Sequence, residues 1–151
     1  MSTTTVSKSI QIDAPVEKVF DFIANPHTFY QAWPFDWDYT ISDEAKAPDG
    51  SVMSFKVTWS IPIGRLHYDS QFTIIRKEYV PNERLVQEAP MVLDSYIFEP
   101  SGDGTLLTNT TEVSSRVPLL DKAGILITTR GEGMDRVTEE FLAKVKEFLE
   151  A

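Results

Sequence analysis

Asp94 is the residue of this chain whose type and position most directly suggest chemistry. It lies in the segment 91–99, where the alternation that turns the ring of Tyr96 inward turns Asp94 the same way. A carboxylate in an apolar cavity has a raised pKa and can act as a general acid or base, or can bind a ligand hydroxyl. Tyr68 could assist, so Asp94, Tyr68 and Tyr96 are the candidate catalytic residues. The alternative is that Asp94 meets water at the end of its strand, beside Pro90.

The other polar motifs do not indicate a metal site or a second catalytic centre. His27 and His67 are the only histidines, and no pair of His, Asp or Glu has the spacing of a metal-binding motif. The glycines that flank Glu132 follow no strand and precede no Lys-Ser/Thr pair, which argues against a phosphate-binding loop. The absence of cysteine excludes thiolate chemistry. We therefore expect no metal and no cofactor.

The alternation of side chains and the helix-capping residues indicate which strands and helices position these residues. Alternating side chains predict strands at 7–13, 36–45, 51–60, 66–77, 84–88, 91–99 and 105–115. Two short helices follow the first strand, one capped by Asp13 and one running from Asn25-Pro26 towards Trp33. Short turns between consecutive strands predict an antiparallel meander with the helices on one face, an α+β domain that comprises residues 1–151.

A long amphipathic helix is predicted at the end of the chain, over 118–151. Its apolar positions recur at steps of three, four or seven, and they should dock on the sheet. They are Leu120, Ala123, Ile127, Met134, Val137, Phe141, Val145 and Phe148.

Three segments resemble the Bet v 1-like helix-grip fold, also called the START or SRPBCC superfamily. They are SIQIDAPVEKVFDFIANP at 9–26, VPNERLV at 80–86 and YIFEPSGDGTLLT at 96–108. The resemblance implies a seven-stranded curved antiparallel sheet wrapped around the long C-terminal helix, with a deep cavity between them. The superfamily includes lipid and hormone binders, polyketide cyclases and dehydratases, and chaperone cofactors. The fold alone therefore does not decide which of these functions the protein has.

Strand alternation and the apolar face of the helix select the side chains expected to line that cavity and bind a ligand. They are Tyr39, Met53, Phe55, Val57, Trp59, Tyr68, Phe72, Asp94, Tyr96, Asn109, Thr111, Met134, Val137 and Phe141. The alternative is that the same side chains fill the interior as an ordinary core.

Four connections at one end of the predicted meander are apolar, although loops are normally polar. We expect them to surround the cavity mouth, with the residues Trp33, Phe35, Ile61, Ile63, Pro90, Leu119 and Leu120. They could instead pack together as a plug or bury themselves in a homodimer contact.

The composition restricts the possible partners. A formal net charge of −9 argues against nucleic acid and against an anionic membrane surface. No apolar run approaches the ~18 residues of a membrane span, and residues 1–6 lack the apolar core of a signal peptide, so we expect a cytoplasmic protein with no integral membrane association.

Three functions remain open. The first is binding of a hydrophobic or amphipathic small molecule, such as a lipid, a polyketide or an aromatic metabolite. The second is a polyketide cyclase or dehydratase that uses acid/base residues in the cavity. The third is a protein-interaction module like the chaperone cofactors.

Overall fold

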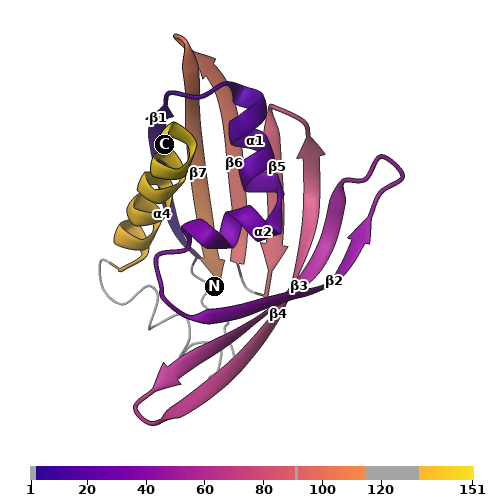
Figure 1. Ribbon diagram of the computed structural model, residues 1–151, viewed down its shortest axis with the longest axis vertical. Helices are drawn as coiled ribbons and strands as arrows, with labels where there is room; N and C mark the ends of the chain where they lie inside the picture. The colour runs from indigo at the N-terminus through magenta and orange to yellow at the C-terminus, as the bar shows by residue number, and fades with distance from the viewer. Residues whose placement is uncertain (1–2, 91, 115–132) are drawn as a thin grey trace.

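The computed structural model describes residues 3–90, 92–114 and 133–151, and its helices lie on one face of a curved sheet (Figure 1). The strands are β1 (Thr3–Ile12), β2 (Asp38–Lys46), β3 (Val52–Ile63), β4 (Leu66–Val80), β5 (Arg84–Ala89), β6 (Val92–Ser101) and β7 (Gly104–Ser114). The helices are α1 (Val16–Ala24), α2 (Pro26–Phe29), the 3-10 helix η1 (Tyr30–Ala32) and α4 (Gly133–Glu150). In these ranges no helix is both long and apolar enough to cross a bilayer.

The seven strands form one sheet in the order β1-β7-β6-β5-β4-β3-β2, and every neighbouring pair is antiparallel. The strands from β2 to β7 follow one another as a meander, and β1 joins the far edge beside β7. Register shifts between Ser42 and Ala45 in β2 and between Arg76 and Glu78 in β4 bend the sheet at these points. The predicted α+β class, the curved seven-stranded sheet and the helix-grip arrangement are confirmed.

The hairpin of β3 and β4 is longer than predicted and projects from the body of the sheet (Figure 1). We expected a turn at 61–64, but β3 continues to Ile63 and the chain reverses at Gly64, whose φ is +61°. Pro62 is tolerated because β2 pairs with β3 only as far as Ser60, so the missing N–H of Pro62 breaks no bond on that side. The prediction was wrong because it read this proline as a turn signal.

The buried face of α4 contains Phe141 and Val145 as predicted but differs from the predicted face at its edges. Phe141, Leu142 and Val145 are buried, and Thr138 is buried on the same side. Phe148 was expected inside, but it is 49% exposed and only touches Phe22, at 5.7 Å between ring centroids. The observed stripe follows steps of three and four through 138, 141, 142 and 145, and Phe148 falls on its edge. The predicted residues 118–132 of this helix lie outside the described residues.

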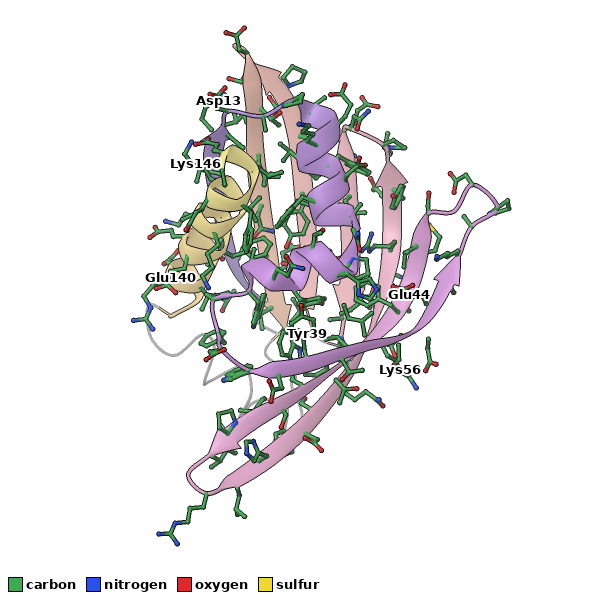
Figure 2. The ribbon with its side chains drawn as sticks, viewed as in Figure 1. Asp13, Tyr39, Glu44, Lys56, Glu140 and Lys146 are labelled. Atoms are coloured by element: carbon green, nitrogen blue, oxygen red, sulfur yellow. The ribbon has the colours of Figure 1, made fainter. Side chains whose placement is uncertain are left out.

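Charged side chains cover the outer side of α4, where Glu140 points away from the sheet (Figure 2). At its inner edge Lys8 of β1 lies 3.1 Å from Glu139 and 3.7 Å from Asp135. Exposed ion pairs of this kind contribute little to stability, so burial of the apolar stripe holds the helix.

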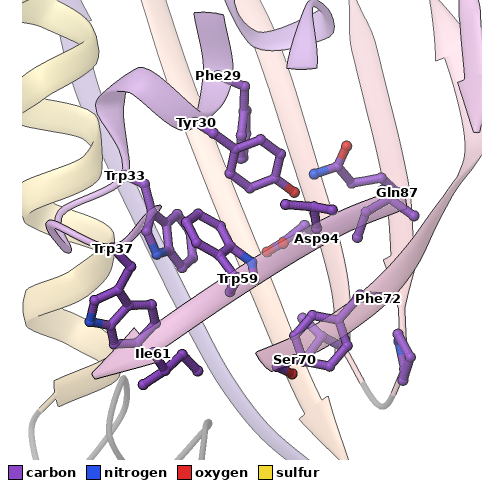
Figure 3. Close-up of a pocket in the computed structure, with 15 residues that line it drawn as sticks. Phe29, Tyr30, Trp33, Trp37, Trp59, Ile61, Ser70, Phe72, Gln87 and Asp94 are labelled. Atoms are coloured by element: carbon purple, nitrogen blue, oxygen red, sulfur yellow. The ribbon is translucent and has the colours of Figure 1, made fainter. Parts of the chain in front are cut away.

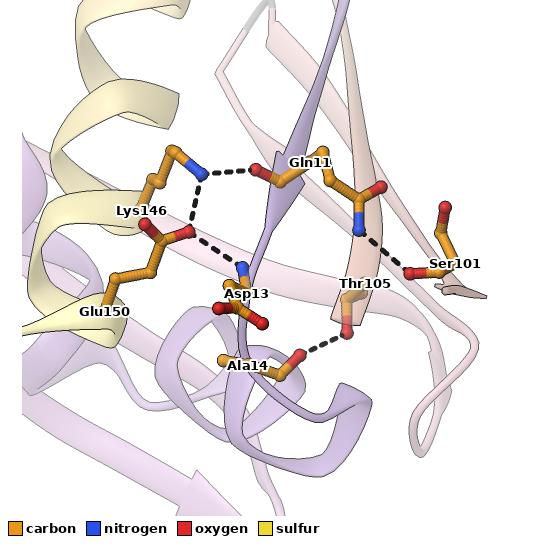
Figure 4. Close-up of polar contacts among 7 residues, drawn as sticks. All are labelled: Gln11, Asp13, Ala14, Ser101, Thr105, Lys146 and Glu150. Atoms are coloured by element: carbon orange, nitrogen blue, oxygen red, sulfur yellow. Dashed lines mark hydrogen bonds and ion pairs between the residues drawn. The ribbon is translucent and has the colours of Figure 1, made fainter. Parts of the chain in front are cut away.

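The end of α4 is fixed to the junction between β1 and α1 (Figure 4). The backbone N–H of Asp13 donates to Glu150 Oε2 at 2.8 Å, and Lys146 Nζ donates to the carbonyl of Gln11 at 2.8 Å. Asp13 was predicted to cap α1, and this is wrong: Pro15 is the N-cap residue and no side chain caps the helix. The backbone of Asp13 is instead the point where the C-terminal end of α4 is fixed to the end of β1.

Gly104 opens β7 where the chain passes close to the end of β1. A Cβ at this position would lie 2.2 Å from the carbonyl oxygen of Ile12, so Gly104→Ala should lower the free energy of unfolding by about 2–3 kcal/mol. At Gly64 an added Cβ meets nothing within 4 Å, so Gly64→Ala should cost only about 1 kcal/mol for its positive φ. Urea denaturation of both variants measures the difference, and equal losses would contradict the close approach.

Candidate functional site

A row of polar side chains crosses the concave face of the sheet from β4 to β7. The register places Arg76 opposite Gln87, and Gln87 opposite Asp94. Asp94 in turn lies opposite Thr111. Arg76 and Gln87 are buried, and Asp94 and Thr111 are partly buried, so the row belongs to the interior. Polar groups are costly in an apolar interior unless they find partners, which makes this row the candidate site.

A cavity of about 150 Å³ opens above one part of this row (Figure 3). It is lined by Phe29, Tyr30, Trp33, Trp37, Val57, Trp59, Ile61, Ser70, Phe72, Ile74, Gln87, Ala89, Pro90, Val92 and Asp94. A cavity of this size can hold about one aromatic ring. Its lining therefore combines mostly apolar walls with a few polar groups, as small-molecule sites usually do.

Trp59 is the centre of the aromatic wall. Its ring centroid lies 5.3 Å from that of Tyr30, 5.8 Å from Trp33 and 6.0 Å from Trp37. Period-two alternation in β3 brings Trp59 inward, while η1 and the segment after it bring the other three rings over it. All three tryptophans of the chain line the cavity, so their fluorescence reports directly on its contents.

Asp94 is the acidic group of the cavity lining. Thr111 Oγ1 donates to Asp94 Oδ1 at 2.6 Å, and Asn109 also bonds to the carboxylate. Burial raises the pKa of Asp94 to about 6, and the two hydrogen bonds oppose this rise. In the part of the chain that the structure describes, Asp94 forms no ion pair with Lys, Arg or His. Near neutral pH it is therefore a largely ionised carboxylate with no counter-ion among the described side chains.

Tyr30 brings a phenol to the same cavity, and sequence reasoning missed it. Burial, and then the charge of Asp94, hold the pKa of Tyr30 well above its ordinary value, so the hydroxyl stays protonated. Figure 3 shows this hydroxyl directed to the side of the cavity where Gln87 and Asp94 lie. No periodic pattern surrounds Tyr30 in the sequence because it sits in a 3-10 turn of three residues.

Arg76 lies at the end of the polar row and is only 5% exposed. Its Nη2 donates to the carbonyl oxygen of Ala24 at 3.0 Å, and its guanidinium lies 5.3 Å from the ring centroid of Phe55. The carbonyl of Ala24 ends α1, so the cation caps the negative end of that helix. Burial lowers the pKa of Arg76, although three tyrosines oppose this shift. Arg76 therefore has a structural role and is absent from the cavity lining.

Several buried polar atoms have no hydrogen-bond partner within the described ranges. They are Trp33 Nε1, Gln87 Oε1, and Nε and Nη1 of Arg76. Trp33 and Gln87 line the cavity, so an indole N–H and an amide are available to a ligand there.

The cavity lining contains some of the residues named from the sequence. From the predicted ligand-binding set it includes Val57, Trp59, Phe72 and Asp94, and from the predicted mouth Trp33, Ile61 and Pro90. The residues Tyr39, Met53, Phe55, Tyr68, Tyr96, Asn109, Thr111, Val137 and Phe141 lie outside this lining. Leu119, Leu120 and the side chain of Met134 lie outside the described residues.

The three candidate catalytic residues are not brought together in this cavity. Tyr96 is buried in the core, where its ring packs against Phe29 at 5.9 Å and Phe141 at 6.4 Å. Burial also raises the pKa of Tyr96 well above its ordinary value. Tyr68 is half-buried on β4 and does not line the cavity. Asp94 is the one member of the set that does, and Tyr30 is the phenol beside it.

Two residues of the predicted mouth lie elsewhere on the surface. Ile63 is 51% exposed at the end of β3, away from the lining of the cavity. Phe35 is half-buried and does not line the cavity, but it stacks on Trp37 of the lining with 4.6 Å between centroids.

Among the described residues no three His, Asp or Glu side chains are grouped so that they could hold a metal ion.

Comparison with known proteins agrees with this arrangement. The family model described as polyketide cyclase / dehydrase and lipid transport matches residues 3–150. The chain belongs to this family. The family match and the likeness to a START superfamily protein support the SRPBCC/START fold for this chain. A comparison with curated proteins gives no match.

Solved structures resemble the chain over nearly its whole length at low sequence identity. A protein from Chromobacterium violaceum has a TM-score of 0.71 and 15% identity, covering 98% of this chain and 99% of that one. A START superfamily protein from Mycobacterium smegmatis has a TM-score of 0.67 and 15% identity, covering 97% of each chain. A protein from Thermus thermophilus has a TM-score of 0.66 and 15% identity, covering 97% of each. At such identities the likeness concerns the fold alone.

Proposed function

We propose that this protein binds a hydrophobic or amphipathic small molecule in the cavity beside Asp94. The observation that carries the proposal is a cavity of about 150 Å³ whose walls are mainly aromatic and whose polar groups gather at one side. Tyr30, Gln87 and Asp94 can orient a polar end of the ligand, while Trp33 and Trp59 contact its apolar body. Membership of a family of cyclases, dehydrases and lipid transporters supports the same proposal.

A second candidate function is catalysis of the cyclase or dehydratase type. The observation that favours it is the pKa of Asp94, which burial raises to about 6 and so brings near neutral pH, where a carboxyl can both accept and release protons. Tyr30 would then serve as a neutral hydrogen-bond donor to a carbonyl or enolate oxygen. Binding is the first proposal because it needs only the cavity, whereas catalysis also needs a substrate that reacts there.

Titration of tryptophan fluorescence with 2-phenylethanol tests the proposal, because this probe carries one ring and one hydroxyl. We expect saturable quenching or a shift of the emission, since every tryptophan lies in the cavity wall. Ala89→Phe places a ring at the cavity lining and should weaken binding at least about tenfold, which corresponds to ~1.4 kcal/mol.

Ala143→Phe is the matched control, because Ala143 is exposed on α4 and does not line the cavity. It should bind the probe as the unchanged protein does. Equal affinity in all three proteins would contradict the proposed site.

A further inference from the structure

The cavity combines an unpaired carboxylate with aromatic walls, and this combination restricts the charge of its ligand. Asp94 is bonded by Thr111 and Asn109, but none of the described cations pairs with it. A buried carboxylate is costly unless a cation or several donors compensate its charge. Within residues 3–90, 92–114 and 133–151, the negative charge of Asp94 is therefore left for a ligand to neutralise.

The aromatic walls suit the same partner. Trp33, Trp37, Trp59 and Tyr30 all line the cavity, and aromatic ring faces attract cations within about 6 Å, with tryptophan the strongest. Figure 3 shows Trp59 and Tyr30 on the side of the cavity where Asp94 lies, so a cation bound to Asp94 lies beside these two rings. A formal net charge of −9 also favours the approach of cations over anions.

We propose that the ligand is a small organic cation, an aromatic or alkyl amine whose ammonium group binds Asp94 within the tryptophan-lined cavity. This inference rests on the proposed function and specifies its ligand class. The ammonium group donates to the Asp94 carboxylate, with the oxygen of Tyr30 as a further acceptor on the same side of the cavity. Trp59 and its neighbours contact the apolar part of the amine and its charged head.

The groups around Asp94 determine how this binding depends on pH. Gln87 on β5 and Thr111 on β7 are neutral, and the raised pKa values keep Tyr30 and Tyr96 protonated. Arg76 on β4 lies beyond Gln87 in the row, and its guanidinium contacts Ala24 and Phe55. Asp94 is thus the group that titrates near pH 6, and protonation removes the charge that holds the amine.

Three probes of one size and different charge test the inference by tryptophan fluorescence: 2-phenylethylamine, 2-phenylethanol and phenylacetate. At about pH 7.5 the amine should bind at least about tenfold more tightly than the alcohol, and the anion most weakly. At about pH 5 the affinity for the amine should fall by about tenfold while that for the alcohol stays nearly constant.

Two asparagine variants separate the cavity charge from the net charge of the protein. Asp94→Asn should remove the preference for the amine over the alcohol, because both probes then meet a neutral amide in place of the carboxylate. Asp69→Asn is the matched control, because Asp69 is exposed on the other face of β4 and its replacement changes the net charge equally. This control should keep the full preference for the amine.

The outcomes distinguish this inference from the proposed function on which it rests. Equal affinity for amine and alcohol, or equal effects of the two variants, would overturn the cation assignment and leave the binding function intact. Tightest binding of phenylacetate would overturn it in favour of an anion held from the side of Arg76. If none of the three probes changes the fluorescence, the proposed function fails together with the inference.

Discussion

Replacing Phe141 with alanine should lower the free energy of unfolding by about 3–5 kcal/mol. Phe141 is 3% exposed, and its ring centroid lies 4.8 Å from that of Phe29 and 6.3 Å from that of Trp33. It is therefore the side chain through which α4 contacts both α2 and the wall of the cavity. Truncation removes apolar contact and leaves a void that rigid neighbours on the sheet cannot fill. Urea unfolding followed by circular dichroism measures the loss.

Phe148→Ala is the matched control for this prediction. Phe148 is on the same helix but is 49% exposed, so its replacement should cost less than about 1 kcal/mol. A loss below about 1 kcal/mol for Phe141→Ala, or equal losses for both variants, would mean that α4 does not dock through the face containing Phe141.

The second large effect concerns Asp94→Asn, which should stabilise the unliganded protein at about pH 8. Burial raises the pKa of Asp94 from 3.8 to about 6, and one pKa unit corresponds to about 1.4 kcal/mol. The ionised carboxylate therefore lowers the stability by about 2–3 kcal/mol above pH 6, and asparagine removes this cost while keeping the oxygen that accepts from Thr111.

The sign of this effect follows from proton binding. Between pH 3.8 and about 6 the folded protein holds a proton on Asp94 that the unfolded chain has released, so stability falls as the pH rises through this window. Asp94→Asn should thus give no stabilisation near pH 4 and the full gain near pH 8. Asp69→Asn, at an exposed position, is the matched control and should change the free energy of unfolding by less than about 0.5 kcal/mol. Equal stability of Asp94→Asn and the unchanged protein at both pH values would show that Asp94 is not desolvated.

Much of the fold was predictable because its signals are local. Alternation in β3 and β4 assigned Trp59 and Phe72 to the interior, and glycines and prolines marked most turns. Two errors came from tertiary context. Pro62 continues a strand because its neighbour β2 has already ended, and Phe148 lies at the edge of the buried stripe of α4, where its ring contacts Phe22 of α1. Neither fact is contained in a window of the sequence.

The site was only partly predictable for a related reason. Asp94 was found because a charged residue at an inward-facing strand position stands out in the sequence. The same alternation of inward and outward positions, followed along 66–77 and 84–88, would have found Arg76 and Gln87. Tyr30 carries no such signal, since it reaches the cavity from a short 3-10 helix whose position depends on packing. The separation of Tyr68 and Tyr96 from the cavity also depends on the curvature of the sheet, which alternation alone does not give.

The central claim is that the space between the tryptophans and Asp94 binds a small molecule, and the indole N–H resonances of the protein test it most directly. The chain has three tryptophans, at 33, 37 and 59, and all three line the cavity. In a nitrogen–proton correlation spectrum we expect all three indole signals to shift saturably with 2-phenylethylamine, with one dissociation constant. In Ala89→Phe the same titration should require at least about tenfold more amine. Indole signals that stay in place while surface amides shift would contradict the account.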